Sequence, residues 1–360
     1  MVFARGSGDD MVLNLLAGID ISKLLGLALR TSIGVQAATF ALAAVGLNLH
    51  YGYTGLLNFG VVAFMAAGAY GMAIFFTQGW LGGSLLLGIA AGLVFAIGIA
   101  LSIGLPSLRL RADYLAITTI AIAEVLRISF RSQRLLDLTG GPFGLPSIED
   151  RNANVSFADV VTIDWNPIND GAYGFWRLRF DEQTLWVMIL GWTMVMLTTL
   201  LIWGLMRSPW GRVIKAIRED EDAARALGKN VFSYKLQSLI IGGMIVALAG
   251  ITRSLNTGFV ETQQFKPQTT FFIWTVLILG GAASVWGPVI GAITFWFIIV
   301  FVEELLRQMV DSGWIPEAIL ESNDIASVRM IMMGIMLAVL MIWRPQGLVG
   351  KKEEAQIDVR

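Results

Sequence analysis

Glu124 is the side chain in this sequence that is best placed to do chemistry, because it is an acid within an apolar stretch that runs from about Asp113 to Phe130. An acid among apolar residues is typical of a proton or ion relay in a membrane. Arg127 follows three residues later on the same helix face, where the two charges can pair and share the cost of desolvation. The sequence leaves both interpretations open: a coupling acid or a structural ion pair.

The residue types exclude most classes of catalysis. The sequence has no cysteine and a single histidine, His50, which rules out thiol chemistry, disulfides and a histidine metal cluster. It has no GxxxxGK[ST] phosphate loop, so the chain has no evident means of hydrolysing ATP. A Ser/His/Asp set and a basic, aromatic-rich nucleic-acid patch are also missing from the sequence. We therefore expect neither an enzyme nor a cofactor nor a nucleic-acid partner.

The composition predicts an integral membrane protein. Hydrophobic residues make up 56% of the 360 positions and charged residues only 15%, and the mean hydropathy is +0.68. The stretch 31–108 contains no Asp, Glu, Lys or Arg, which leaves room for three crossings at about 20 residues each. We expect an all-α, multi-pass protein of the cell (plasma or inner) membrane, with about eight helices, between six and ten, some of them broken.

The remaining crossings follow from uncharged runs and their breaks. Proline and glycine at 287–288 make one straight helix through the run 267–302 unfavourable, so we expect two short helices there. After the three helices within 31–108, the expected crossings lie at 113–130, 183–206, 236–252, 267–302 in two parts, and 325–343.

Charge segregation predicts which ends of these helices face the cytoplasm. The segment 135–183 holds eight acidic and three basic residues, and 303–324 holds six acids and one arginine, so we place both outside. The segment 207–235 holds seven basic and four acidic residues between two apolar runs. Basic loops stay in the cytoplasm, so we place this segment inside.

The glycine-rich stretch around Gly52 is the second candidate for chemistry. Backbone that leaves a helix inside a membrane must line a polar cavity or be buried in protein, and transporters use such breaks to hold substrates. The alternative is close helix packing through small residues. Thr118 and Thr119, in the predicted helix 113–130, could present their hydroxyls to a cavity or bond to their own helix. The candidate path residues are Gly52, Tyr53, Thr54, Gly55, Asn58, Thr118, Thr119 and Glu124.

The charged segment 207–235 has the composition of a docking helix. Its acids favour a helix N-terminus, Ala223 and Ala224 permit close approach to a partner, and Gly228 can end the helix. The alternative is a basic loop anchored to anionic membrane lipid. The candidate contact residues are Arg212, Arg218, Glu219, Asp220, Asp222, Ala223, Ala224, Leu227 and Gly228.

Five motifs in order give the chain a family resemblance. Asp222-Ala-Ala-Arg-Ala-Leu-Gly228 resembles the EAA-x-x-x-G signature of ABC importer permeases, with Asp in place of Glu and without the usual proline-ending continuation. Other stretches resemble the LivM-like permeases of branched-chain amino acid ABC importers. They are GLNLHYGYTGLLNFG at 46–60, LPSLRLRADYLAITT at 105–119, GGAASVWGP at 280–288 and WRPQGLVG at 343–350.

The resemblance implies a function and a set of partners. It implies a transmembrane permease that imports branched-chain or related hydrophobic amino acids, energised by two cytoplasmic ABC ATPase subunits that grip the segment 207–235. It also implies a second, LivH-like permease and an extracytoplasmic solute-binding protein. A urea or short-amide permease is the related alternative, and an ion-coupled secondary transporter that uses Glu124 is the alternative of another class.

The distribution of charged and apolar residues also suggests how the chain divides. We expect residues 1–30 to be an amphipathic or frayed lead-in, with a first crossing at 12–29 as the alternative. Residues 31–345 would form a single permease domain, with an external loop at 135–183 and a cytoplasmic coupling loop at 207–235. Residues 346–360 would be a cytoplasmic tail.

Overall fold

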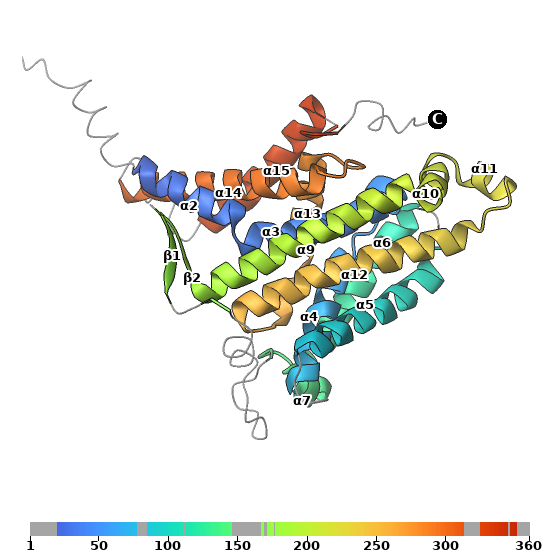
Figure 1. Cartoon of the computed structure of the whole chain (residues 1–360), viewed down its shortest axis with the longest axis horizontal. Coiled ribbons are helices and arrows are strands. Elements are labelled where there is room, and N and C mark those ends of the chain that lie inside the picture. The colour runs from blue at the N-terminus through green and yellow to red at the C-terminus, as the bar shows by residue number, and fades with distance from the viewer. Residues whose placement is uncertain are drawn as a thin grey trace, which may run out of the picture.

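The structure is a computed structural model that describes residues 20–77, 85–110, 112–145, 167–168, 171–175, 177–312, 325–344 and 346–350. It is a bundle of helices with one small β-hairpin (Figure 1). The predicted all-α membrane fold with broken helices is confirmed.

The first half of the chain contains α2 (Ile21–Ile33), α3 (Val35–Leu47), the π-helix η1 (Asn48–Tyr53), α4 (Val61–Thr77), α5 (Leu85–Ser107), α6 (Ala112–Phe130), the 3₁₀-helix η3 (Gln133–Leu135) and α7 (Leu136–Thr139). The second half contains β1 (Ala172–Phe175), β2 (Leu178–Asp181), α9 (Glu182–Arg207), α10 (Pro209–Glu219), α11 (Glu221–Ala226), α12 (Val231–Thr257), the 3₁₀-helix η4 (Thr262–Phe265), α13 (Pro267–Gly280), α14 (Gly287–Asp311) and α15 (Ile325–Trp343). The two strands pair antiparallel, with Ala172 opposite Asp181.

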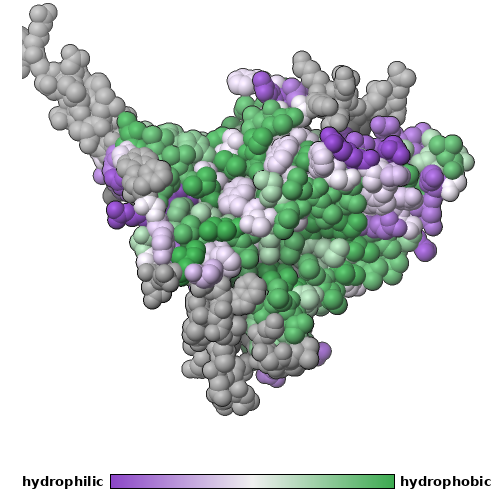
Figure 2. Space-filling view, viewed as in Figure 1, coloured by the Kyte–Doolittle hydropathy of each residue, from purple (hydrophilic) through white to green (hydrophobic). Residues whose placement is uncertain are grey.

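Helix length and hydropathy agree with a multi-pass membrane protein. Among the described residues, α5, α9, α12 and α14 are long and apolar enough to cross a membrane, and α2 with α3–η1 forms a fifth span bent by 42°. Three shorter apolar helices lie at 61–76, 267–280 and 327–336. Together these make eight apolar segments. A broad apolar surface covers α5 and α12, and hydrophilic residues gather over α10 and α11 (Figure 2).

The charged loop and the hairpin lie at opposite ends of the bundle. Helix α9 runs from the hairpin at one end to α10 and α11 at the other, and α12 returns beside it (Figure 1). We call the end that carries α10 and α11 the coupling end. The part of the predicted external loop at 146–166 lies outside the described residues.

Helix α12 forms the centre of the bundle, packed against α3, α4 and α5. Glycines allow the main chains to touch. A Cβ on Gly250 would lie 2.0 Å from the carbonyl oxygen of Met65, and one on Gly68 would lie 2.3 Å from that of Ala247. Membrane helices associate through such small residues because lipid supplies little hydrophobic driving force between them.

Helix α2 begins within the stretch proposed as a lead-in. Residues 1–19 lie outside the described residues, whereas 21–30 form the first turns of α2. The charges there are paired: Lys23 Nζ lies 2.9 Å from Glu304 Oε1, and Asp20 Oδ2 lies 2.9 Å from Arg177 Nη2. Pairing with the hairpin and with α14 lowers the cost of holding these charges at the end of a helix that enters the membrane.

Helix α14 also runs further than its uncharged segment. It continues to Asp311, through the start of the acidic segment that begins at Glu303. Partners on other helices allow this extension, because Glu303 Oε2 accepts from Arg329 of α15 at 3.1 Å and Glu304 pairs with Lys23. Residues 313–324 of the acidic segment lie outside the described residues.

The glycine contacts of α12 give a stability prediction. We expect Gly250→Ala to lower the free energy of unfolding by about 1–3 kcal/mol, because the new methyl group must displace the α4 main chain. Gly98→Ala on α5 is the matched control, since no atom outside its own stretch of helix lies within 4 Å of its added Cβ. Thermal unfolding of both variants in detergent tests this, and equal melting temperatures would contradict the packing described.

Candidate functional site

The predicted break near Gly52 is present, and it ends α3. The helix widens into the π-helix η1, and the chain then runs without helical structure until α4 begins at Val61. Gly55 adopts φ 76°, a left-handed conformation that glycine adopts at little cost. The chain at 54–60 is therefore non-helical backbone inside the bundle.

The protein itself satisfies polar groups that this break frees. The Thr54 hydroxyl donates to the carbonyl oxygen of Leu49 at 2.8 Å and lies 2.6 Å from the hydroxyl of Ser238 on α12. The Leu56 N–H donates to the carbonyl oxygen of His50 at 2.8 Å. These contacts replace the water that a break would use at a surface.

His50 and Asn58 complete the buried network. His50 Nε2 lies 3.2 Å from the carbonyl oxygen of Leu239, so Nε2 carries the proton, and Nδ1 then accepts from the Asn58 amide at 3.1 Å. The Asn58 side-chain oxygen accepts from the Gly60 N–H at 2.8 Å, and its main-chain oxygen accepts from the Trp274 indole at 3.2 Å. The pair thus joins η1, α12 and α13.

Asn48 connects this break to a second one, between α13 and α14. Its side-chain oxygen accepts from the Ala283 N–H and its amide donates to the Ser284 carbonyl oxygen, both at 2.8 Å. Ala283 has φ 62°, which is unusual for a residue with a Cβ. Asn48 is not among the site residues predicted from the sequence. The available signal was an amide in an uncharged run, four residues before Gly52.

The closing WRPQGLVG motif binds the end of α13. The Leu348 N–H donates to the carbonyl oxygen of Leu279 at 2.8 Å, and the Val349 N–H donates to that of Gly280 at 3.1 Å. A Cβ on Gly347 would lie 2.5 Å from the Gly281 nitrogen, so only glycine fits this approach. Three of the motifs therefore meet in space: the Gly52 break, the α13–α14 turn and the closing turn.

Most of the candidate path residues are buried within the chain. Gly52, Tyr53, Thr54, Asn58 and Thr119 are buried, whereas Gly55 is exposed. In this conformation the buried side chains hold the break in place.

Thr118 and Thr119 both bond to their own helix, which is one of the two alternatives that the sequence offered. Thr118 Oγ1 donates to the carbonyl oxygen of Tyr114 at 2.7 Å, and Thr119 Oγ1 donates to that of Ala116 at 2.8 Å. Thr119 Oγ1 also accepts from the Phe59 N–H at 3.1 Å. This hydroxyl therefore ties α6 to the broken segment.

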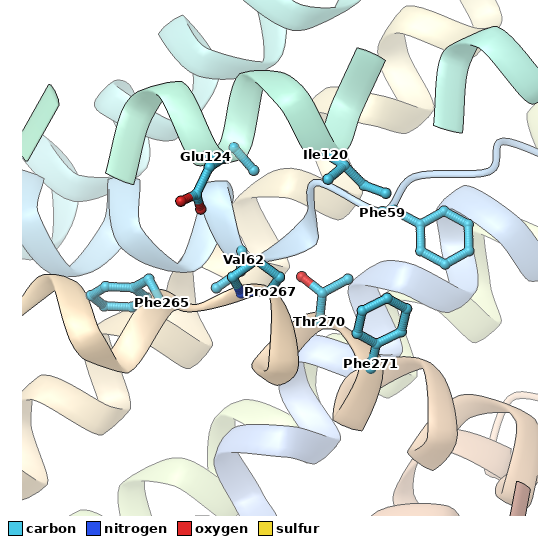
Figure 3. A pocket seen from close by; sticks show the side chains of 9 residues that line it. Phe59, Val62, Ile120, Glu124, Phe265, Pro267, Thr270 and Phe271 are labelled. Carbon is cyan, nitrogen blue, oxygen red and sulfur yellow. The ribbon is translucent and has the colours of Figure 1, made fainter. Parts of the chain in front are cut away.

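Glu124 lines a small cavity between α4, α6 and α13 (Figure 3). Its carboxylate accepts two hydrogen bonds from Arg127, Nε at 2.9 Å and Nη2 at 2.5 Å, so the predicted ion pair is present in a two-point geometry. The cavity volume is about 30 Å³, which is room for one or two waters but not for an amino acid. Its lining comprises Phe59, Val62, Ile120, Ala123, Glu124, Phe265, Pro267, Thr270 and Phe271.

Helix α10 lies flat at the coupling end with one face turned inward. Gly211, Ile214 and Ile217 are buried, Arg218 is half-buried, and Arg212 is exposed. The buried face packs against α9 and α12. The helix is thus fixed to the membrane-spanning bundle.

Helix α11 has the caps that the sequence predicted. The Asp220 carboxylate accepts from the Ala223 N–H at 2.9 Å. At the other end Gly228 has φ 76°, and the Lys229 N–H donates back to the carbonyl oxygen of Ala224, which forms a Schellman motif.

The outer face of this loop is open to solvent. Leu227 is 78% exposed, and it lies on a charged segment outside the apolar spans. The other exposed candidates are Arg212, Glu219, Asp220, Asp222, Ala223 and Gly228, whereas Ala224 is buried against Ile217 and Val231. Candidate contact residues thus form a surface held on a fixed support.

Asn48 gives a prediction for the paired breaks. We expect Asn48→Ala to lower the free energy of unfolding by about 1–3 kcal/mol, mainly because the buried Ala283 N–H loses its partner, while the partly buried Ser284 carbonyl loses its donor. Thr193→Ala is the control, because that exposed hydroxyl bonds only locally, to Ile189 four residues earlier. Denaturation in detergent micelles measures both, and an Asn48→Ala protein as stable as the control would contradict the bridge.

Comparisons with known proteins identify the family. A family profile described as "Branched-chain amino acid transport system / permease component" matches residues 29–341. The chain is 31% identical over 321 residues to the high-affinity branched-chain amino acid transport system permease protein LivM of Escherichia coli (strain K12), covering 88% of this chain and 69% of that protein. It is 25% identical over 345 residues to a probable LivM of Methanocaldococcus jannaschii, covering 87% and 91% of the two chains.

A more distant likeness covers about a third of the chain. The autoinducer 2 import system permease protein LsrC of Photorhabdus laumondii is 29% identical over 123 residues, 32% of this chain and 37% of that protein. No solved structure matches. The matched family consists of transport permeases and not of enzymes, and its match agrees with a multi-pass protein of the inner membrane. The chain belongs to the family of permease components of branched-chain amino acid transport systems.

Proposed function

We propose that this chain is one permease subunit of an ABC importer that moves branched-chain or related hydrophobic amino acids into the cytoplasm. Its partners would be a second, LivH-like permease, two cytoplasmic ABC ATPase subunits and an extracytoplasmic solute-binding protein. The single observation that carries the proposal is the α10–α11 surface, which packs against the bundle on its inner side and is exposed on its outer side in a chain of this family.

The chemistry of α11 supports docking to a protein over anchoring to lipid. Anionic lipid attracts a basic surface, but α11 begins with Glu221 and Asp222, and Arg225 is already paired with both at 2.9 and 3.0 Å. The exposed Leu227 and the small Ala223 beside it suit a groove on a partner protein. We therefore assign this surface to the ATPase.

The substrate path would lie along an open face of the subunit. The cavity beside Glu124 is too small for cargo, whereas Ile120 and Phe271 are 39% and 52% exposed at its mouth. Phe59 joins this face, with its ring stacked 4.6 Å from that of Trp274. We propose that the second permease faces this surface and that cargo passes between the two subunits.

The candidate residues at 52–58 and at 118–119 would then act indirectly on the path. Thr119 holds the main chain of Phe59, and Asn58 holds the next residue, Gly60, so the break determines where the Phe59 ring stands. The apolar face that results is suited to an aliphatic side chain. A urea or short-amide cargo would find few hydrogen-bond partners on it.

Reconstitution tests the proposed function. We expect ATPase and a second permease to co-purify with this chain in mild detergent, and the complex in liposomes to take up leucine, isoleucine or valine only with internal ATP and external binding protein. Ionophores that collapse proton and sodium gradients should leave uptake unchanged. Uptake that persists without ATP, or competition by urea but not by leucine, would contradict the proposal.

Glu124 separates this mechanism from ion coupling. We expect the double variant Glu124→Gln/Arg127→Gln to keep ATP-driven uptake within about threefold of the parent, because removing both charges leaves neither one unpaired. An ion-coupled carrier would lose its coupling acid and its uptake. Initial rates of uptake measure the difference, and a loss of more than a hundredfold in correctly assembled protein would favour the ion-coupled alternative.

A further inference from the structure

The coupling loop touches the broken helix directly, through Arg218. The Arg218 guanidinium Nη1 donates to the main-chain oxygen of Gly52 at 2.5 Å. The stem of the same side chain passes over Gly55, where an added Cβ would lie 3.4 Å from Arg218 Cγ. One turn earlier, Lys215 Nζ lies 6.0 Å from the centre of the Tyr53 ring. Two basic side chains of α10 thus meet the break.

The break presents a carbonyl that suits this contact. Gly52 lies within the π-helix η1, close to its end, where carbonyl oxygens no longer have regular helical partners. A guanidinium is a strong donor to such an oxygen, because a charged hydrogen bond is shorter and stronger than a neutral one. The bond joins residues 166 positions apart, so it does not follow from local structure.

The contact also leads on to the second break. A Cβ on Gly52 would lie 2.0 Å from Asn48 Oδ1 and 2.6 Å from the Ala283 nitrogen. Gly52 is therefore the point where α10, η1 and the α13–α14 turn come together. A displacement of Gly52 toward Asn48 would therefore press on the side chain that bonds Ala283 and Ser284.

Helices α10 and α11 pack into one unit. Ala224 of α11 packs against Ile217 of α10 and Val231 of α12. The Asp220 residue that ends α10 also caps α11, so no flexible linker separates the two helices. Arg218 lies within this unit, two residues before the cap.

We propose that Arg218 is the residue that transmits movement of the docking surface to the broken helices, through the Gly52 carbonyl and Asn48. This inference rests on the proposed function, since it assumes that an ATPase moves α11. Arg218 is a positioning residue in this scheme. The sequence grouped it with the candidate contact residues, but its side chain is half-buried and its guanidinium bonds Gly52 inside the protein. We therefore expect neither cargo binding nor ATPase binding to require it. Loss of the Arg218 side chain should therefore leave ATP hydrolysis in place and lower the amount of cargo transported per ATP.

The test compares Arg218→Ala with the parent in the full transporter in liposomes. We expect Arg218→Ala to assemble with the ATPase and to hydrolyse ATP within about twofold of the parent, while the amount of leucine taken up per ATP falls at least tenfold. Arg218→Lys, which keeps the charge with fewer donors, should fall in between. Arg109→Ala is the control, because that exposed arginine also lies near the coupling end but contacts the Phe232 ring of α12 and not the break.

Two results would overturn the inference. One is an unchanged amount of leucine per ATP in Arg218→Ala. The other is loss of ATPase binding in step with loss of uptake, which would make Arg218 a docking residue. If Arg218→Ala does not assemble, the same two measurements, leucine uptake per ATP and ATPase binding, are made on Arg218→Lys. Failure of the proposed function would instead appear in the parent complex, as uptake that needs no ATP.

A double-mutant cycle tests the route through Asn48. If Arg218 acts through Gly52 and Asn48, the combined variant Arg218→Ala/Asn48→Ala should lower leucine uptake per ATP no further than the more impaired single variant. The pair Arg109→Ala/Asn48→Ala should instead show the product of its two separate effects. This route would be contradicted if the Arg218→Ala/Asn48→Ala variant lowered leucine uptake per ATP by the product of the two single effects.

Discussion

A peptide group that leaves a helix inside a membrane has no water to bind, so the protein must supply its partner. This requirement shapes the coupling end of the chain. At the first break, the Thr54 hydroxyl bonds the Leu49 carbonyl and the Ser238 hydroxyl. At the second break, Asn48 forms the hydrogen bonds, and the closing turn donates to the last carbonyls of α13. Because each break is satisfied by a different part of the chain, the breaks are held to one another as well as to the bundle.

That arrangement gives the molecule a stiff interior and an accessible edge. Main-chain contacts at glycines such as Gly250 and Gly68 leave little room for helices to slide past each other. The breaks are the places where the helical hydrogen-bond pattern already changes, and α10 lies against one of them. A partner that moves α10 and α11 would thus act on the first break, and the open face beside Phe59 lies next to the same break.

Sequence patterns predicted the helices well where charge and glycine mark their ends. The uncharged run 183–206 matches α9 within one residue at each end, and Gly228 ends α11 as expected. They did not predict that α14 continues past Glu303, because the partners that neutralise its acids, Lys23 and Arg329, lie on other helices. The bond from Asn48 to Ser284 spans 236 positions. No local pattern indicates such a pairing, so the sequence points to a break but not to what satisfies it.

Amide hydrogen exchange in the assembled transporter tests the central claim most directly. The account predicts that the segment 48–60 exchanges slowly at rest, because its polar groups are held inside the protein. It further predicts that ATP binding changes exchange in this segment and in 209–219 together. Rapid exchange of 48–60 in the resting state, as in a solvent-exposed loop, would contradict the claim that the chain closes its own break.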